Sequence, residues 1–307
     1  MNRMPCTNSC LAAAWVLAVL LGACHWPEPS KAAEPREIHT ADYDLIIPAE
    51  QKALLILFPC FSCDAADTRS ESKITNEALA NGIAVLLMHF NRHIFMTYAE
   101  REAVISTIEQ AVKANELNAQ NTFIGGFSSG GNVSVLLAKD LLNSPRPDVG
   151  LKGLFAVDSP LDLSHLYGSS KRRVERPSFP EYKDEGRMIV ALLDSILRDP
   201  TTNPTGYEVV SPLMNTEASV SPLKDLPVRF YTEPDTTWWR VNRGDRYEDL
   251  NAYALGRIHG ALKAAGNTRA EFITTKDRGI QHGNRHPHAW SIVDEKELVN
   301  WIQVLSN

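Results

Sequence analysis

The strongest constraint on the fold of this chain is a sharp turn between a short apolar strand and an amphipathic helix. The strand is predicted at Thr122-Phe123-Ile124, and the turn after it reads Gly126-Phe127-Ser128-Ser129-Gly130. The apolar residues that follow the turn share one helical face: Val133, Leu136, Leu137 and Leu141. Glycine at the edges of such a turn lets the strand and helix backbones approach without Cβ clashes. The sequence therefore predicts a strand–turn–helix unit with a serine at its tip.

The rest of the chain alternates between apolar runs of strand length and helical patterns. Strands are predicted at 53–58, 83–88, 154–157, 228–231 and 271–274, and helices near 71–80, 98–114 and 185–197, before Gly266 and from Asp294 onward. This alternation predicts an α/β fold, a three-layer α/β/α sandwich around a mostly parallel twisted sheet. Residues 160–225 contain no convincing strand, so we expect a cap over the strand ends, with a surface decoration as the alternative.

Ser128 is the better nucleophile candidate of the two adjacent serines. Choosing Ser129 would place Phe127 at a turn position that requires a small residue. The N-terminus of the following helix favours negative charge that develops beside the serine. A glycine-rich turn that carries a solvated serine is the structural alternative.

The turn, its setting and the histidine-rich C-terminal region resemble the α/β-hydrolase superfamily over residues 43–307. The resemblance implies a serine hydrolase that forms an acyl-enzyme, has the chain order serine, acid, histidine, and needs no cofactor or metal. The expected substrate is a small or acylated molecule, by default a carboxylic ester. A peptidase or amidase of the same fold is one alternative, and a binding protein without turnover is another.

The resemblance places the histidine in the loop between the last strand and the last helix. This loop holds His282, His286 and His288. His288 is the first candidate because it lies closest to the final helix, and His286 is the second. The spacing H-x-x-x-H-x-H would also suit a metal site, but no carboxylate or thiol with clear spacing joins the three.

The acid is expected after the strand at 228–231, where Asp235 is the first candidate. It would accept the Nδ1 proton of the histidine and fix the tautomer. Glu233 is its nearest competitor. Asp158 is a further alternative because it ends the preceding strand, where some members of the superfamily carry the acid.

Two backbone N–H groups are expected to form an oxyanion hole. One is the amide of Ser129, directly after the nucleophile. The other comes from the loop after the strand at 53–58, where Phe61 is the candidate by position and Ser62 is the next. Many relatives carry His-Gly in this loop, which this chain lacks.

The same loop contains a C-x-x-C pair, Cys60 and Cys63. The sequence has no second pair to complete a zinc site. In an oxidising compartment a local disulfide is the simpler expectation, and two free thiols are the alternative. A bridge would hold the loop and preorganise the amide of Phe61.

The N-terminus is interpreted as a targeting segment, with an apolar core at 11–21 that is too short to span a bilayer comfortably. Leu21-Gly22-Ala23-Cys24 resembles the bacterial lipobox. This implies removal of a signal peptide at 1–23 and acylation of Cys24, followed by a tether at 24–42. We therefore expect a protein of the bacterial cell envelope, held on a membrane by its N-terminal lipid. Ordinary secretory cleavage near a chance cysteine is the alternative.

Charge adds two expectations. The net charge of -6, without a basic stripe, argues against a nucleic-acid partner. The densest basic run, residues 171–176, is expected to be a solvated loop face.

Trp238 and Trp239, which follow the acid candidate, either line a substrate cleft or pack against the cap.

Overall fold

The computed structural model of the chain describes residues 34–89, 93–176 and 179–307. The predicted signal peptide at 1–23, the acylation candidate Cys24 and most of the predicted tether lie outside the described residues. Within the described part, none of the helices combines the length and apolar character needed to cross a bilayer.

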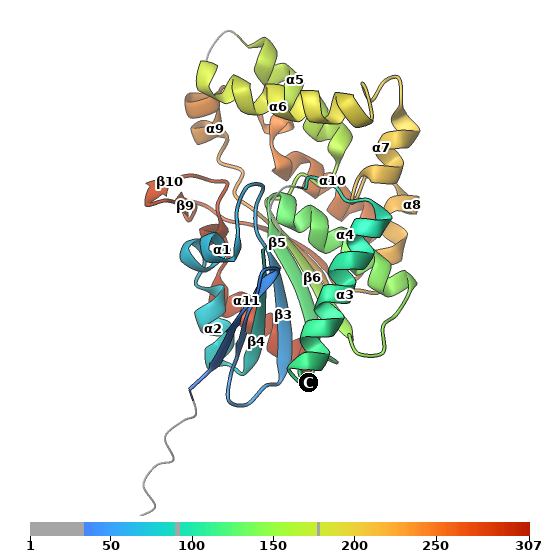
Figure 1. Cartoon of the computed structure of the whole chain (residues 1–307). Helices are drawn as coiled ribbons and strands as arrows, with labels where there is room; N and C mark the ends of the chain where they lie inside the picture. Colours follow the sequence, from blue (N-terminus) through green and yellow to red (C-terminus); the bar gives the residue numbers. More distant parts are fainter. Residues whose placement is uncertain (1–33, 90–92, 177–178) are drawn as a thin grey trace, which may run out of the picture. The chain divides into compact units, whose positions relative to one another are not determined.

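An eight-stranded sheet forms the centre of residues 34–307 (Figure 1). Its strands run in the spatial order β1-β2-β4-β3-β5-β6-β7-β8. The β1–β2 and β2–β4 pairs are antiparallel, and the remaining pairs of this sheet are parallel. The predicted mostly parallel sheet is therefore confirmed. The strands are β1 (Arg36–His39), β2 (Tyr43–Ile47), β3 (Ala53–Phe58), β4 (Ile83–Met88), β5 (Thr122–Phe127), β6 (Leu151–Val157), β7 (Val228–Thr232) and β8 (Ala270–Thr274), with a separate hairpin of β9 (Ile280–Gln281) and β10 (Asn284–Arg285).

Helices cover both faces of the sheet, as the alternating pattern predicts. The α-helices are α1 (Ala65–Glu71), α2 (Ile74–Ala80), α3 (Tyr98–Ala114), α4 (Ser129–Asn143), α5 (Leu163–Glu175), α6 (Pro180–Ile196), α7 (Pro204–Val210), α8 (Glu217–Val220), α9 (Thr236–Arg243), α10 (Asn251–Ala264) and α11 (Glu295–Ser306). Within the described ranges, three short 3-10 helices join them: η1 (Ser221–Leu223), η2 (Tyr247–Asp249) and η3 (Trp290–Ile292).

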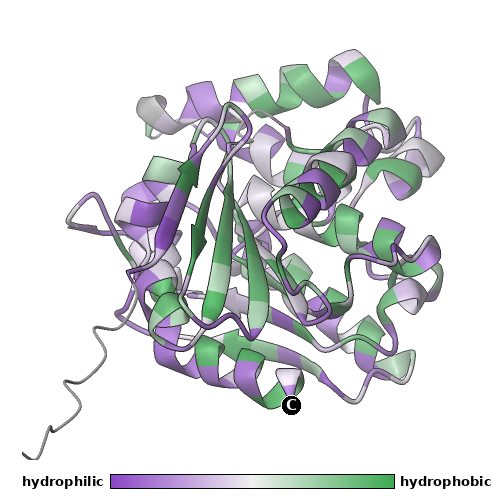
Figure 2. Cartoon of the chain, turned by 60° about the horizontal axis from the view of Figure 1, so that its bottom comes forward, coloured by the Kyte–Doolittle hydropathy of each residue, from purple (hydrophilic) through white to green (hydrophobic). Residues whose placement is uncertain are grey.

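The period of two along β3 divides the core into two layers. Leu55 and Leu57 join a buried cluster that includes side chains of α2 and α11. Leu54 and Ile56 point the other way, into a buried cluster that includes side chains of α3 and α4. Apolar colour runs along the central strands in Figure 2, because a sheet covered on both faces needs apolar residues at every position.

The structure departs from the sequence prediction near the N-terminal end of the described part. The sequence predicts a tether through residue 42, but Arg36–His39 form the edge strand β1 and pair with β2. The helix predicted near 71–80 is α2, and a separate helix that was not predicted, α1, precedes it. The backbone is extended at Ser72, which separates the two helices. The hydroxyl of Ser72 accepts a hydrogen bond from the N–H of Ile74 at 3.0 Å.

The segment between β6 and β7 is helical and divides into two parts. Helices α5 and α6 lie over the carboxyl ends of the strands (Figure 1) and share a buried apolar cluster that includes Leu166 and Leu193. By contrast, Val220 of α8 and Leu223 of η1 pack with Val228 of the sheet. The part of this segment that covers the strand ends is therefore α5 and α6.

The backbone of α4 passes very close to the carboxyl ends of β3 and β5. A Cβ atom on Gly126 would collide with the backbone of Gly130. A Cβ atom on Gly130 would collide with the carbonyl oxygens of Phe58 and Pro59. Glycine is required at both positions because the neighbouring atoms belong to the backbone and cannot rotate away.

Replacing Gly130 with alanine should lower the free energy of unfolding by about 1–3 kcal/mol, because the added methyl group must displace backbone. Gly260→Ala is the matched control. Gly260 is an exposed residue of α10, and no atom lies within 4 Å of the added Cβ. The control should raise the free energy of unfolding by about 0.5–1 kcal/mol. Urea unfolding measures both variants, and equal effects would contradict the close approach.

Candidate active site

Ser128 occupies the tip of the turn between β5 and α4. Its backbone has φ 54° and ψ −125°, a conformation that residues with a side chain rarely adopt. Its N–H donates to the carbonyl of Val157 on β6 at 2.9 Å, and its carbonyl accepts from the N–H of Gly131 at 3.0 Å. The neighbouring strand and the helix thus fix the strained residue from both sides.

The two predicted oxyanion donors lie in the walls of one cavity with Ser128. Ser129 is the first residue of α4, so its N–H belongs to the unpaired donors at a helix N-terminus. Phe61 lies in the loop after β3. Among the described residues, neither amide donates a hydrogen bond to a protein acceptor. Ser62, the alternative donor, lines a neighbouring cavity instead.

A disulfide joins Cys60 and Cys63 across this loop. The N–H of Cys63 also donates to the carbonyl of Cys60 at 3.0 Å, and Ser62 takes a positive φ of 64°. The bridge and the turn together restrict the backbone around Phe61.

His288 donates from Nδ1 to Oδ2 of Asp158 at 2.6 Å. The acceptor is a carboxylate, so the proton belongs on Nδ1 and Nε2 is left as a proton acceptor. The ring of His288 also packs against Phe127, with 4.5 Å between the ring centroids. His288 and Ser128 line the same cavity.

Asp158 is buried and held by several neighbours. It follows β6 directly with a φ of 43°, and its N–H donates to the carbonyl of Tyr231 at 2.7 Å. Its second carboxylate oxygen accepts from the hydroxyl of Thr232 at 2.7 Å, and its carbonyl accepts from the side chain of Asn251 at 2.7 Å. Sequence reasoning missed Thr232 and Asn251, although Thr232 ends the strand next to β6.

The cavity that these groups share has a volume of about 290 Å³. The strand ends supply its floor, and the cap supplies apolar side chains, among them Leu166 of α5 and Ile189 of α6. Trp239 of α9 lines it as well. A cavity of this size, with apolar side chains beside converging polar and charged groups, suits a small organic ligand.

The described residues are similar in structure to several solved proteins. MPT51 of Mycobacterium tuberculosis gives a TM-score of 0.57 at 12% sequence identity, over 90% of this chain and 98% of that one. Carboxyl esterase 2 of the mycorrhizal fungus Tuber melanosporum gives 0.54 at 16% identity, over 92% and 87%. An S-formylglutathione hydrolase from Agrobacterium tumefaciens gives 0.54 at 9% identity, over 89% and 93%. No family model matches the sequence, and no curated protein matches it.

The chain has the α/β-hydrolase fold. In this α/β-hydrolase sheet β6 and β7 are parallel neighbours, so the aspartates after both strands arrive at the same edge. The sequence predicts that Asp235, after β7, orients the histidine, and this prediction is wrong because Asp158, after β6, occupies that position. Asp235 instead caps α9, accepting from the N–H of Trp238 at 2.9 Å, and forms an ion pair with Arg285 at 2.9 Å.

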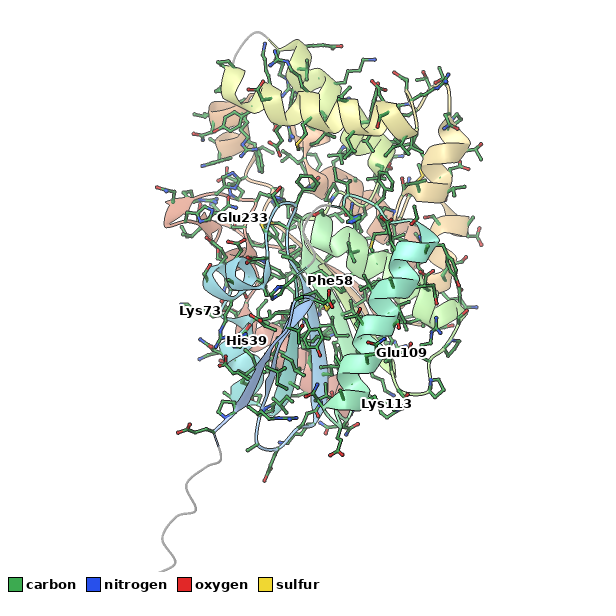
Figure 3. The ribbon with its side chains drawn as sticks, in the orientation of Figure 1. His39, Phe58, Lys73, Glu109, Lys113 and Glu233 are labelled. Carbon is green, nitrogen blue, oxygen red and sulfur yellow. A yellow bond between two sulfur atoms is a disulfide. The ribbon has the colours of Figure 1, made fainter. Side chains whose placement is uncertain are left out.

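Glu233, the nearest competitor for the acid, directly follows β7 and is labelled in Figure 3. Its side chain is buried, and one carboxylate oxygen accepts from the hydroxyl of Thr275 and from the N–H groups of Arg278 and Gly279, at 3.0 to 3.1 Å. It therefore ties the loop after β8, which leads to the three histidines, to the end of β7.

The three histidines of this loop have separate partners. Nδ1 of the exposed His282 lies 2.7 Å from a carboxylate oxygen of Glu71. His286 accepts at Nε2 from Arg243 at 2.8 Å and donates from Nδ1 to the carbonyl of His288 at 2.9 Å. Nowhere in residues 34–89, 93–176 and 179–307 do three His, Cys, Asp or Glu side chains gather as metal ligands would.

The environment of His286 keeps its imidazole neutral. Burial lowers its pKa to about 4, and the nearby charge of Arg243 acts in the same direction. Trp238 packs edge-on against the ring, with 4.8 Å between the centroids. Trp238 and Trp239 therefore enclose this second histidine at one side of the cavity.

The depressed pKa of His286 predicts a pH dependence of stability. The unfolded chain binds a proton here below about pH 6.5, whereas the folded chain binds it only near pH 4. The unfolded state thus holds more protons in this window, so the free energy of unfolding falls as the pH drops from 6.5 towards 4. His286→Gln should flatten this decline, as measured by urea unfolding at a series of pH values. An unchanged slope would show that His286 titrates normally.

Proposed function

We propose that this protein is a serine hydrolase that cleaves carboxylic esters, with Ser128 as nucleophile, His288 as general base and Asp158 as the residue that orients the histidine. The observation that carries the proposal is the 2.6 Å bond from His288 Nδ1 to Asp158 in the wall of the cavity that Ser128 also lines. This bond fixes the tautomer whose free nitrogen can take a proton from a serine hydroxyl.

The reaction would proceed in two halves. Ser128 Oγ attacks the ester carbonyl carbon while its proton passes to Nε2 of His288. The tetrahedral intermediate then expels the alcohol, which takes that proton, and an acyl-enzyme on Ser128 remains. A water molecule repeats the sequence, releases the acid and restores the serine. Asp158 stays ionised throughout and stabilises the imidazolium.

The amides of Ser129 and Phe61 would bind the negative oxygen of the tetrahedral intermediate. Both lack protein acceptors among the described residues, so neither has to break an existing hydrogen bond when the charge develops. Donors that are already oriented give the largest stabilisation of such a charge. The Cys60–Cys63 bridge supports this role because it restricts the loop that carries Phe61.

The comparisons support esters as the first substrates to test. Two of the similar structures are named as a carboxyl esterase and an S-formylglutathione hydrolase. The same groups would also cleave an amide, whereas a binding protein would cleave neither an ester nor an amide. A panel of matched esters and amides therefore separates the three readings.

Covalent labelling tests the nucleophile directly. A fluorophosphonate probe should label the wild-type protein, and Ser128→Ala should abolish the label and lower kcat by roughly 10⁴- to 10⁶-fold. Ser129→Ala is the neighbouring control, since only the backbone amide of Ser129 enters the mechanism. A label that persists in Ser128→Ala, or a wild-type protein that never reacts and turns over no ester or amide, would contradict the proposal.

Two variants test which aspartate orients the histidine. Asp158→Asn keeps the shape but should lower kcat by about 10⁴-fold, because it no longer holds the productive tautomer of His288. Asp235→Asn should retain activity, since asparagine caps a helix as well as aspartate does. The reverse result would identify Asp235, after β7, as the acid.

The cellular location is a further part of the proposal. Acylation of Cys24, after removal of residues 1–23, would hold the enzyme on a bacterial membrane. Cys24→Ala should then move the protein from the membrane fraction to the aqueous fraction in a detergent phase-partition experiment. The isolated hydrolase activity should stay the same. Equal partitioning of both forms would indicate ordinary secretory cleavage.

A further inference from the structure

Arg243, the last residue of α9, lines the same cavity as Ser128 and His288. Its side chain is only 15% exposed. The guanidinium lies against two aromatic faces, 4.3 Å from the ring centroid of Tyr182 and 5.2 Å from that of Trp239. These contacts fix the plane of the guanidinium but do not neutralise its charge.

The hydrogen bonds of Arg243 leave its charge poorly balanced. Nη2 donates to the imidazole of His286, which is held neutral, so this bond brings no negative charge. Nη1 donates to Oε2 of Glu185 at 3.4 Å, but the Glu185 side chain is 48% exposed, so solvent screens this ion pair. Within the described part of the chain, Nε has no acceptor. A largely buried cation with so little compensation is costly.

The other arginine in the cavity wall, Arg173, is fully paired. Its Nε lies 3.1 and 3.0 Å from the two carboxylate oxygens of the buried Asp245. Asp245 also forms an ion pair with Arg176, and Asp249 forms ion pairs with both Arg172 and Arg176. The basic run that was expected to be a solvated face therefore forms a network with buried carboxylates. Arg173 thus has a buried carboxylate partner, whereas Arg243 pairs, among the described residues, with the half-exposed Glu185 alone.

We propose that Arg243 binds an anionic group of the substrate, so that the preferred substrates are esters that carry a carboxylate a few bonds away from the scissile carbonyl. The substrate carboxylate would take the place of Glu185 at the guanidinium and supply the charge that the cavity wall lacks. A carboxylate suits this site because the planar guanidinium offers it two parallel donors. The proposal rests on the proposed function, since it specifies the substrate of the same site.

Matched esters measure the preference. On the acyl side, 4-nitrophenyl hydrogen glutarate and 4-nitrophenyl pentanoate differ by a carboxylate in place of a methyl group. On the alcohol side, 4-acetoxybenzoate and 4-methylphenyl acetate differ in the same way. The readout is the ratio of kcat/KM for the anionic ester over the neutral one. We expect at least one pair to show a ratio that Arg243→Gln lowers by about 10- to 100-fold, the range for a hydrogen bond to a charged group.

Three further variants separate charge recognition from general damage. Arg243→Lys should keep part of the preference because it keeps the charge. Glu185→Gln should raise the ratio, since it removes the competing carboxylate. Arg240→Gln changes an exposed arginine three residues earlier on the same helix and should leave the ratio unchanged. Ratios that do not respond to Arg243→Gln in either pair would overturn the proposal.

Binding without turnover keeps the two proposals distinct. Calorimetry with 4-nitrophenyl hydrogen glutarate should show weaker binding to the double variant Ser128→Ala, Arg243→Gln than to Ser128→Ala alone. Equal affinities would overturn the role of Arg243 whatever the activity. Suppose that neutral esters are hydrolysed and the probe labels Ser128, but the ratio of kcat/KM values is the same in the wild type and in Arg243→Gln. The anion site alone is then wrong. If the probe labels nothing but the affinities differ, the hydrolase proposal alone is wrong.

Discussion

The close approach of one helix to two strand ends is the constraint on which the site depends. Glycine at 126 and 130 removes the Cβ atoms that would hold α4 away from β3 and β5. The chain can then reverse within a few residues, and Ser128 takes the positive φ that this reversal requires. The same turn places the N–H of Ser129 at a helix N-terminus, in a residue that lines the cavity. The positions of the proposed nucleophile and of one proposed oxyanion donor thus follow from one packing contact.

Around this turn, each ionisable group has a distinct set of partners. Asp158 is directed at His288 by Thr232 and Asn251, whereas Asp235 is engaged by its own helix N-terminus and an arginine. Different partners distinguish two neighbouring histidines in the same way. His288 has a carboxylate partner, while His286 has an arginine and a peptide carbonyl and remains neutral. The surroundings of a group, rather than its chemical type, decide which one can act as a base.

The cap and α9 together give the cavity its apolar roof and its charged groups. Helices α5 and α6 place leucine and isoleucine side chains over the strand ends, and α6 also brings Glu185 to Arg243. Carboxylates buried between α5 and the segment after α9 neutralise Arg173 and Arg176 but not Arg243. The resulting imbalance is the basis for expecting an anionic substrate, and it arises from contacts between parts of the chain that are far apart in sequence.

The sequence by itself determined the features that depend on local pattern. Apolar runs and helical periodicity gave a mostly parallel sheet with helices on both faces, and the glycine-flanked Ser128 located the turn. The loop after the last strand narrowed the histidine to three residues. Tertiary structure decided the choice among groups that arrive together at one sheet edge. Asp158 and Asp235 follow adjacent parallel strands, so pattern alone cannot decide between them. Only the packed structure shows that Asp235 is occupied by α9 and Arg285, because those contacts join segments that are distant in sequence.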